Sequence, residues 1–494
     1  MGPIHDVQGL EQGGVNSSDH YKIFAREQLD MAQRSALGVP LGKLTVSAIG
    51  QADDTVLVSN DIGFLSSLLS LTVSFCEKYL VQLCPDKTKL QAFAQDNIKI
   101  DQAYPIRIGD TTIPFSATAE HVGIIRSTDG NLPSLMSRFS AHKKSIASLL
   151  HTGLAKGHRA NPATGLFLHK LYGTSVLFSG LASLVLSEKE IKKIDVHYSE
   201  VLRTLMRLHS KTPRSCIYFL AGSLPGEALL HLRQLSLFGM ITRLDNDHLL
   251  KQHARNIFSL ETISKHSWFH QIIKWCTLYN LQHPLDFLEH PPTKEKFKTT
   301  VKKKVLTFWE LKLHADSDAL RSLLSFQSRF MYLTMPHPLW SSCRSSPYRV
   351  SMATVQAQML TSRYRVGALT RHWIKDYKGN CRLSTECLDS LEDLPHLLQW
   401  CPALHNIRHE LLDYTRKYVV KLPHFVAKLL LKLVNPTSSS FCQVLLDCSV
   451  VPEIISLSQI NGDWVFNEFF EVTRTWVFKL HLERLKRLHL WNAG

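Results

Sequence analysis

Short apolar runs separated by polar turns dominate the first quarter of the chain. Residues 45–49 and 55–58 read as two β-type runs, and Gln51-Ala52-Asp53-Asp54 lies between them. Two such runs joined by a short polar turn predict a β-hairpin. This hairpin carries two adjacent carboxylates, Asp53 and Asp54, at its tip. A second hairpin is predicted around Gly109-Asp110.

The spacing of apolar residues changes to three or four after residue 132, which is the period of an amphipathic helix. Helices are predicted over residues 135–150, 165–187 and 193–208, and a basic amphipathic helix is predicted over residues 469–491. In the first quarter, residues 63–79 form a further helical stretch. We therefore expect an α+β fold, in which a mixed first quarter is followed by a mainly α-helical remainder.

The adjacent carboxylates of Asp53 and Asp54 repel each other unless something neutralises them. Hard divalent cations do this well, because Mg²⁺ takes carboxylate and phosphate oxygens in one coordination shell. The pattern therefore indicates a candidate metal site of a phosphoryl-transfer enzyme. The alternative is that Asp-Asp merely closes a hairpin, because aspartate is a favoured turn residue. Taken alone, the turn interpretation is favoured.

Neighbouring motifs reverse that preference. The motifs are Asp6 to Gly14 (DVQGLEQGG), Gln51 to Asp54 (QADD), Cys84 to Thr88 (CPDKT) and His121 to Ile124 (HVGI). In this order they resemble the reverse transcriptase of non-LTR (LINE-type) retrotransposons, in particular the chicken-repeat-like group. Each motif is weak alone, whereas four in the right order are specific. The resemblance extends over almost the whole chain, with few motifs between residues 125 and 380.

The resemblance implies catalytic roles for three residues. Asp53 would hold Mg²⁺, and Asp54 would tune the site from the next position. Lys87 would neutralise or protonate the leaving pyrophosphate, because phosphoryl transfer depends mainly on positioning and on neutralising charge. A solvated surface lysine explains Lys87 equally well.

The resemblance also implies substrate contacts at Gln12, Gly13 and Gln51. Gln12 and Gly13 lie in a glycine-containing loop that would approach the template and the incoming nucleotide, although an ordinary loop before a helix has the same composition. Gln51 departs from the family, which usually has an aromatic residue there, so substrate contacts at this position are expected to differ.

The family's fingers and the palm strand with its other metal-binding aspartate would lie upstream of the first motif. We therefore expect a fragment of an RNA-directed DNA polymerase that binds Mg²⁺ weakly and is inactive alone. Its partners would be an RNA template, a DNA primer or target and, if active, deoxynucleotide triphosphates. Two alternatives stay open: a non-catalytic nucleic-acid-binding protein derived from a retrotransposon, and a decayed reading frame.

The chain is strongly basic, with a formal net charge of +15 and a pI near 9.3 over 494 residues. That balance favours a polyanionic partner, and nucleic acid fits it better than an anionic membrane. No apolar run approaches the length that spans a bilayer, so no membrane partner is expected. Ten scattered cysteines indicate a reducing, intracellular compartment. Composition does not predict an oligomeric state.

Basic residues recur on the predicted helices that would form a polymerase thumb. Arg138, Lys143, Lys144, Arg203 and Arg207 lie on these helices and are placed to contact phosphates. A solvated helix face explains the same charges equally well.

Two further basic segments follow. Lys302, Lys303 and Lys304 lie on the polar side of an amphipathic stretch, which suits a nucleic-acid-facing helix, a nuclear localisation signal or a solvated face. Arg363 and Arg365 flank a tyrosine, and arginine planes with aromatic rings suit stacking on unpaired bases. The second segment favours nucleic acid for both.

Cys381, Cys387, His396 and Cys401 form a C-x5-C-x8-H-x4-C pattern. Zn²⁺ takes thiolate and imidazole ligands in a tetrahedron, so this set predicts a zinc knuckle. The retrotransposon family commonly carries a Cys-Cys-His-Cys knuckle near its C-terminus, with a tighter first spacing than here. Three unrelated thiols and a histidine at a helix start are the alternative, and His405 or His409 could replace His396.

These observations predict six consecutive regions. They are a partial reverse-transcriptase palm (1–130), a helical thumb (131–210), a helical region (211–290), a basic helical region (291–375), a zinc knuckle (376–410) and a C-terminal helical region (411–494).

Overall fold

The computed structural model describes residues 17–493, with gaps at 42–43, 94–104, 122, 150–160, 261, 324, 345, 373–374 and 376. The chain divides into two compact units, each assembled from separate stretches of sequence. We call them the N-terminal unit, with residues 1–137, 183–186 and 235–297, and the C-terminal unit, with residues 138–182, 187–234 and 298–494.

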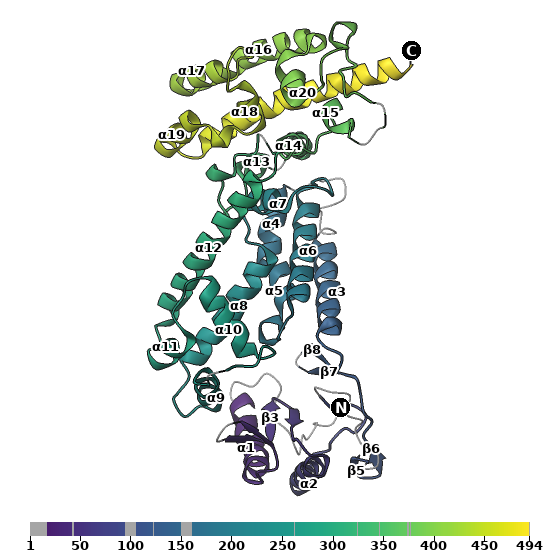
Figure 1. Ribbon diagram of the computed structural model, residues 1–494, viewed down its shortest axis with the longest axis vertical. Coiled ribbons are helices and arrows are strands. Elements are labelled where there is room, and N and C mark those ends of the chain that lie inside the picture. Colours follow the sequence, from purple (N-terminus) through teal and green to yellow (C-terminus); the bar gives the residue numbers. More distant parts are fainter. Residues whose placement is uncertain are drawn as a thin grey trace, which may run out of the picture. The chain divides into compact units, whose positions relative to one another are not determined.

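The β-structure described in the N-terminal unit consists of antiparallel hairpins (Figure 1). The pairs are β1 (Val39–Leu41) with β2 (Leu44–Val46), β3 (Ala48–Gln51) with β4 (Asp54–Leu57), β5 (Arg107–Ile108) with β6 (Thr111–Thr112), and β7 (Thr118–His121) with β8 (Ile124–Ser127). Gln51 pairs with Asp54, so only Ala52 and Asp53 form the β3–β4 turn. Both predicted hairpins are confirmed.

Two helices support the acidic hairpin, α1 (Ser17–Arg34) and α2 (Ile62–Lys78). The α2 helix begins after Asp61, whose side chain accepts a hydrogen bond from the backbone N–H of Phe64 at 2.9 Å. Phe24 of α1 packs against Phe75 of α2, with ring centroids 5.2 Å apart. Strand β3 approaches α1 closely at Gly50, where a Cβ atom would lie 3.3 Å from a leucine side chain.

The rest of the N-terminal unit is helical and has an aromatic core. Its helices are the end of α8 (Gly226–Thr242), α9 (Leu249–Phe258), α10 (Trp268–Leu278) and α11 (Pro284–Glu289). Phe258 and Phe269 meet edge to face at 5.2 Å, and Phe287 meets Phe297 at 5.3 Å in the same geometry. Edge-to-face contacts of this kind stabilise a core beyond the area that they bury.

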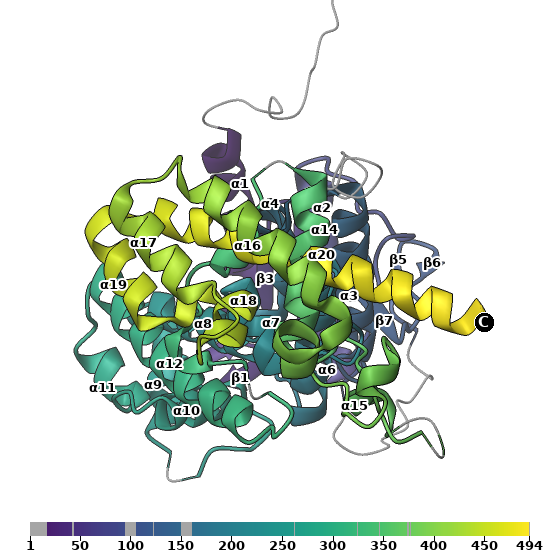
Figure 2. The ribbon, with the colours of Figure 1, turned by 90° about the horizontal axis from the view of Figure 1, so that it is seen from above.

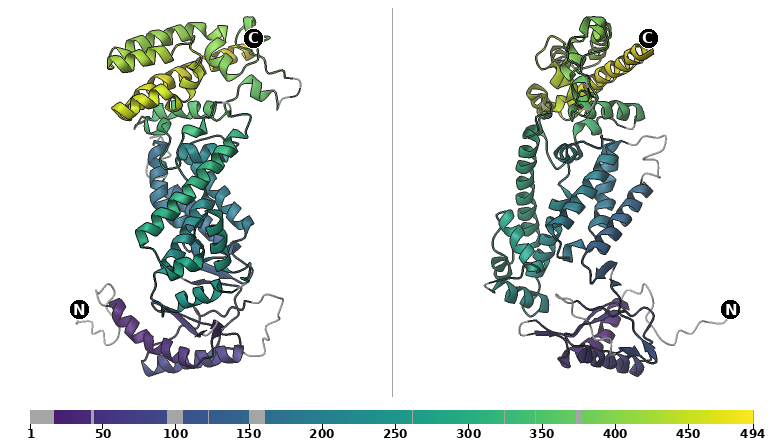
Figure 3. Two further views of the ribbon diagram at one scale, coloured as in Figure 1. Left: turned by 60° about the vertical axis from the view of Figure 1, so that its left-hand side comes forward. Right: turned by 45° about the vertical axis from the view of Figure 1, so that its right-hand side comes forward.

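Upright neighbouring helices form the first part of the C-terminal unit (Figures 1 and 3). They are α3 (Leu132–Leu149, from residue 138), α4 (Pro162–Leu168), α5 (Thr174–Phe178), α6 (Glu188–Leu205) and α7 (Arg214–Ala221). A capping box starts α6: the Ser187 hydroxyl accepts from the Glu190 N–H, and the Glu190 carboxylate accepts from the Ser187 N–H. The helix predicted over 165–187 is confirmed only as far as Phe178: α4, the π-helical turn His169–Gly173 and α5 follow one another without a break, and a turn at 179–180 ends the helix.

Three buried histidines lie among these helices. His142 of α3 is the middle ring: its Nδ1 lies 2.9 Å from His197 Nε2, and its Nε2 lies 3.0 Å from His169 Nε2. A Cβ atom on Gly173 would lie 2.5 Å from His169, so the π turn needs glycine there. Phe139 stacks on His197 at 4.3 Å. We call these three residues the histidine cluster.

The remainder of the C-terminal unit packs around its longest helix, α20. Its helices are α12 (Lys294–Asp318, from residue 298), α13 (Pro338–Ser341), α14 (Pro347–Leu360), α15 (Gly367–Thr370), α16 (His405–Val419), α17 (His424–Leu433), α18 (Phe441–Leu446), α19 (Pro452–Asn461) and α20 (Trp464–Ala493). Short turns at Leu181–Ser183, Ser328–Phe330, Thr385–Cys387, His396–Trp400, Pro402–Leu404 and Cys448–Val450 complete the helical structure described.

Helix α20 packs against α14, α16, α18 and α19, which surround it in the view of Figure 2. Trp476 of α20 is fully buried and donates a hydrogen bond from its indole N–H to the Thr415 hydroxyl of α16 at 2.9 Å. Arg474 is also fully buried, with Nη1 3.1 Å from Cys343 Sγ. The predicted C-terminal helix is therefore largely a core element rather than an exposed basic face.

The predicted α+β class is correct at that level: helices dominate and the sheets described are small and antiparallel. The helices predicted over 63–79, 135–150 and 193–208 correspond to α2, α3 and α6. Among the helices that the structure describes, none is both long and apolar enough to cross a membrane.

Candidate functional site

A tight loop positions the first two cysteines of the predicted knuckle. Asn380 and Leu391 close the loop as an antiparallel bridge, and the N–H of Cys381 donates to Ser390 O at 2.8 Å. Within the loop, Cys387 belongs to a short 3₁₀ turn. Both thiols consequently point into the same buried space, where Cys381 is fully buried and Cys387 nearly so.

A π-helical turn positions the other two residues. The turn covers His396–Trp400, and the N–H of Cys401 donates to His396 O at 2.7 Å. A π turn closes its hydrogen bond over five residues, which brings positions 396 and 401 to the same side. Asp393 fixes the start of this turn, because its carboxylate accepts from the His396 N–H at 2.7 Å. Pro395 and Pro402 bracket this stretch, which is a single helical turn in the wider π form.

The four side chains converge. The sulfur atoms of Cys381, Cys387 and Cys401 lie 3.4, 3.9 and 4.0 Å from one another, and one ligand atom from each of the four residues lies within 4.8 Å of all the others. Zn–S bonds of about 2.3 Å in a tetrahedron place sulfur atoms about 3.8 Å apart. The cluster could therefore hold a metal ion.

A metal that binds this cluster has to displace thiol protons. The hydrogen bond with Cys401, together with burial, raises the pKa of Cys381 to about 12. Burial raises the pKa of Cys387 to about 11. The bond from Cys381 lowers the pKa of Cys401. His396 Nε2 is buried and has no hydrogen-bond partner, and a metal would satisfy this atom while replacing the thiol protons.

A buried ion pair ties the cluster to α20. Arg484 donates from Nε to Glu392 Oε1 at 2.8 Å and from Nη2 to Glu392 Oε2 at 3.0 Å. Glu392 Oε2 also accepts from the N–H of Gly367 at 2.7 Å. Arg408 of α16 donates to the carbonyl of Cys401. Sequence reasoning missed this support, because nothing in the spacing of Glu392 and Arg484 indicates that they meet.

The alternative histidine ligands do not belong to the cluster. His405 and His409 lie on α16, with ring centroids 6.4 Å apart, and the group of four ligand atoms contains His396 instead. The structure therefore selects the predicted set of Cys381, Cys387, His396 and Cys401.

The acidic hairpin is exposed. Ala52, Asp53 and Asp54 are all exposed at its tip, and Ala52 has φ of 50°, a left-handed conformation that costs a non-glycine residue about 1–2 kcal/mol. Tyr21 of α1 lies close enough that both carboxylates act on it: burial raises the pKa of its hydroxyl first, and the charge of Asp53 raises it further. Sequence reasoning missed Tyr21.

The other residues predicted for catalysis are Lys87, Gln12 and Gly13. Lys87 lies in an exposed turn, and no described contact joins it to Asp53 or Asp54. Gln12 and Gly13 lie outside the described residues.

Two further predicted features, Gln51 and the HVGI motif, lie in the described β-structure of the N-terminal unit. Gln51 is exposed at the end of β3. In the HVGI motif, His121 pairs with Ile124 across β7 and β8. Asp53 and Asp54 belong to no group of three metal-capable side chains among the described residues.

The side chains predicted to contact nucleic acid differ in their exposure to solvent. Lys302 and Lys303 are exposed on α12, while neighbouring Val301 and Val305 are buried, so the amphipathic interpretation of this helix is confirmed. Arg365 is exposed and Arg363 is half-buried. The tyrosine between the arginines is 6% exposed and its hydroxyl lies 2.8 Å from the ring of a histidine on α20. It is therefore unable to stack on a base in this structure.

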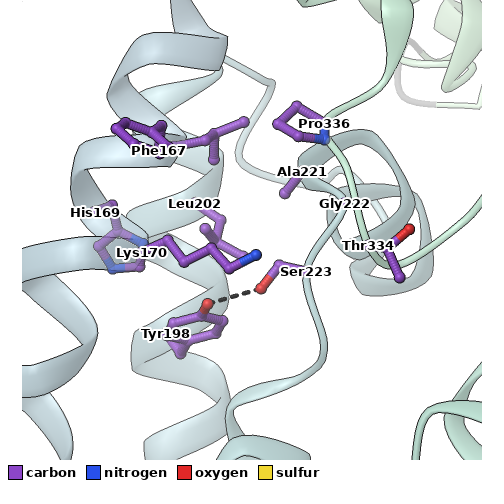
Figure 4. Close-up of a pocket in the computed structure, with 11 residues that line it drawn as sticks. Phe167, His169, Lys170, Tyr198, Leu202, Ala221, Gly222, Ser223, Thr334 and Pro336 are labelled. Atoms are coloured by element: carbon purple, nitrogen blue, oxygen red, sulfur yellow. Dashed lines mark hydrogen bonds between the residues drawn. The ribbon is translucent and has the colours of Figure 1, made fainter. Parts of the chain in front are cut away.

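A cavity of about 200 Å³ lies beside the histidine cluster (Figure 4). Lys170 extends across it, and the Tyr198 hydroxyl lies 2.8 Å from Ser223 Oγ at its edge. Burial raises the pKa of Tyr198 to about 12. The lining contains hydroxyls, an amine and the edge of His169 but no carboxylate or thiol. The cavity therefore shares no residue with either candidate metal site.

Neither the models of known protein families nor the curated protein sequences give a match to this chain.

Proposed function

We propose that this chain is part of an RNA-directed DNA polymerase of the non-LTR retrotransposon type. The observation that carries the proposal is the β3–β4 hairpin, whose two-residue turn displays Asp53 and Asp54 with no basic partner among the described residues. The hairpin β7–β8 at the HVGI motif supports the same assignment. In this proposal the N-terminal unit contributes palm elements, and α3 to α6 contribute a thumb.

In the proposed mechanism Asp53 would hold Mg²⁺, and Asp54 would adjust the charge beside it. The reaction would join a primer 3′-hydroxyl to a nucleotide triphosphate with release of pyrophosphate, and a Mg²⁺ ion held by Asp53 would supply neutralisation of the phosphoryl charge. Asp53 and Asp54 bring no third ligand from the described residues, so these residues alone hold Mg²⁺ weakly. Lys87 would assist the leaving pyrophosphate.

Zn²⁺ is the metal that we propose for the cluster of Cys381, Cys387, His396 and Cys401. Three thiolates and one imidazole suit its tetrahedral preference, and closed four-ligand sites of this type stabilise folds rather than catalyse reactions. The ion pair of Glu392 with Arg484 would then make the metal part of the packing around α20.

Primer extension tests the polymerase. The chain is expressed with any in-frame coding sequence that precedes it, and incorporation on an RNA template is measured with Mg²⁺ present. We expect extension that Asp53→Asn abolishes, while Asp61→Asn, which alters only the cap of α2, retains it. A folded protein that does not extend a primer, or an Asp53→Asn variant that still does, overturns the polymerase assignment.

A second candidate function is nucleic-acid binding without catalysis. The net charge of +15 and the exposed lysines of α12 favour it. Affinity for single-stranded and duplex oligonucleotides is expected to fall steeply with salt, because bound counterions are released from the phosphates. Affinity that does not change between low and moderate salt would overturn the proposed nucleic-acid binding.

A further inference from the structure

The cavity beside the histidine cluster has an apolar end and a polar end (Figure 4). All the residues that line it belong to the C-terminal unit, on α4 and its π-helical turn, on α6, at the end of α7 and in residues 334–336. Phe167 and Pro336 lie at one end, and the amine of Lys170 points toward Ser223 at the other. The volume of about 200 Å³ is many times the roughly 15 Å³ that a single water needs. The cavity is therefore large enough for a small organic molecule.

The polar end carries a positive charge that no acid of the lining neutralises. Within the described part of the chain, the Lys170 amine makes no hydrogen bond or ion pair, and no carboxylate lines the cavity. Asp195, which lies one turn before Tyr198 on α6, is already paired. Its carboxylate accepts a hydrogen bond from the Tyr218 hydroxyl at 2.6 Å and lies 3.1 Å from Arg214 Nη1. An anion in the cavity would therefore be the first acidic partner of Lys170.

Two hydroxyl groups beside the amine supply a hydrogen-bond donor. The Tyr198 hydroxyl lies 2.8 Å from Ser223 Oγ, and Ser223 Oγ donates to Leu224 O at 3.1 Å. Burial raises the pKa of Tyr198 to about 12, so this hydroxyl keeps its proton at neutral pH. A ligand oxygen can take the proton that Ser223 directs to Leu224 O, because Tyr198 then donates to Ser223.

The walls of the cavity are held together by close backbone contact. Gly222 caps the end of α7 in a left-handed conformation with φ of 59°, and a Cβ atom there would lie 1.8 Å from Met335 O. The N–H of His337 donates to Leu220 O at 3.1 Å, which joins the same two segments. A site whose framework is already ordered loses less entropy when it binds a ligand.

We propose that this cavity binds an aromatic phosphate monoester, a class that includes the nucleoside monophosphates. The amine of Lys170 acts as a point charge for the phosphate, a common role of lysine in phosphate sites. The paired hydroxyls of Tyr198 and Ser223 donate to a second phosphate oxygen. The ring of Phe167, which is 58% exposed, offers a face on which a flat aromatic ring stacks. A carboxylate fits less well, because its planar pair of oxygens matches an arginine fork and the lining contains no arginine.

Calorimetric titration of the full chain with adenosine monophosphate tests this proposal. Mg²⁺ is left out, so that no nucleotide binds at the acidic hairpin through a metal. The variants are Lys170→Met, which removes the amine, and Phe167→Ala, which removes the ring; both side chains are exposed, so neither change opens the core. The matched control is Lys144→Met, which removes an exposed amine of α3 that does not line the cavity. Circular dichroism establishes that each variant folds.

The two variants should differ in what they lose. Lys170→Met should weaken the binding of adenosine monophosphate about 10- to 100-fold, as expected for the loss of a charged hydrogen bond. Phe167→Ala should weaken it about 10-fold through lost stacking, and should leave the binding of inorganic phosphate unchanged. Lys144→Met should bind the nucleotide as the unaltered chain does.

Three results overturn the proposal. The first is that the unaltered chain binds no adenosine monophosphate up to about 1 mM, a concentration that occupies even a weak site. The second is that Lys170→Met or Phe167→Ala binds as tightly as the unaltered chain, or that Lys144→Met loses as much as Lys170→Met. The third is that benzoate binds more tightly than phenyl phosphate, which would make the cavity a carboxylate site. None of these results bears on the proposed polymerase, because the cavity shares no residue with the acidic hairpin.

Discussion

Acidification should destabilise the C-terminal unit through the histidine cluster. Burial lowers the pKa of His142 from 6.5 to about 3, and burial lowers the pKa values of His169 and His197 to about 4. Because the folded protein binds these protons less readily than the unfolded chain, unfolding takes up protons below pH 6.5. The contribution to stability is complete above that pH and is lost as the pH falls toward 4.

The magnitude follows from the size of these shifts. A pKa unit corresponds to about 1.4 kcal/mol, so lowering the pH from about 7 to about 5 removes about 2 kcal/mol per histidine. Three such histidines give about 6 kcal/mol as an upper value, because the rings interact and their losses do not add fully. That is a large part of the 5–15 kcal/mol that stabilises a typical domain.

Urea unfolding near pH 7 and near pH 5 measures this loss, and hydrogen exchange of the α6 amides, corrected for its intrinsic pH dependence, locates it in the C-terminal unit. His142→Gln should reduce the difference in unfolding free energy between the two pH values by about 2 kcal/mol. His424→Gln, which alters an exposed histidine at the start of α17, should leave it unchanged. An equal pH dependence for His142→Gln and the unaltered chain would refute the argument.

Further predictions concern the metal centre and the packing around it. Purified under reducing conditions, the chain should hold about one Zn²⁺ per molecule by elemental analysis, Cys401→Ser should lose it, and exposed Cys84→Ser should keep it; absence of metal from the unaltered chain contradicts the zinc proposal. Arg484→Met should lower the free energy of unfolding, measured with urea, by about 3–5 kcal/mol, because it leaves the Glu392 carboxylate buried and unpaired. Adding Glu392→Gln to this variant should restore most of the lost stability. Gly173→Ala should lower the melting temperature of the C-terminal unit, because its Cβ atom would overlap His169; an unchanged melting temperature contradicts this packing.

The elements that the sequence predicted well are those with local causes. The acidic hairpin, the Gly109 hairpin and helix α2 follow from alternation, turn residues and an aspartate cap, all of which act within a few residues. The cysteine cluster was also predictable, because ligand type and spacing carry the signal and the prolines mark the turn.

The parts that the sequence did not predict depend on distant residues. The histidine cluster joins residues from three helices, and each histidine alone looks like an ordinary core or surface residue. The ion pair of Glu392 with Arg484 spans ninety-two residues. The π turn at His169–Gly173 lies inside a continuous helix and leaves the apolar spacing unchanged, so periodicity could not reveal it. The six consecutive regions stay a prediction, since both compact units are assembled from separate stretches.

The π-helical turn between His396 and Cys401 also determines which insertions, deletions and substitutions this stretch of the protein tolerates. Each residue added to or removed from an α-helix rotates the following side chains by about 100°, and the turn here holds one residue more than an α-helical turn would. Deleting one of residues 397–400 would let the turn relax and swing the sulfur of Cys401 away from its partners. Substitutions at the exposed Trp400 leave the backbone path intact. This stretch therefore tolerates changes of side chain far better than changes of length.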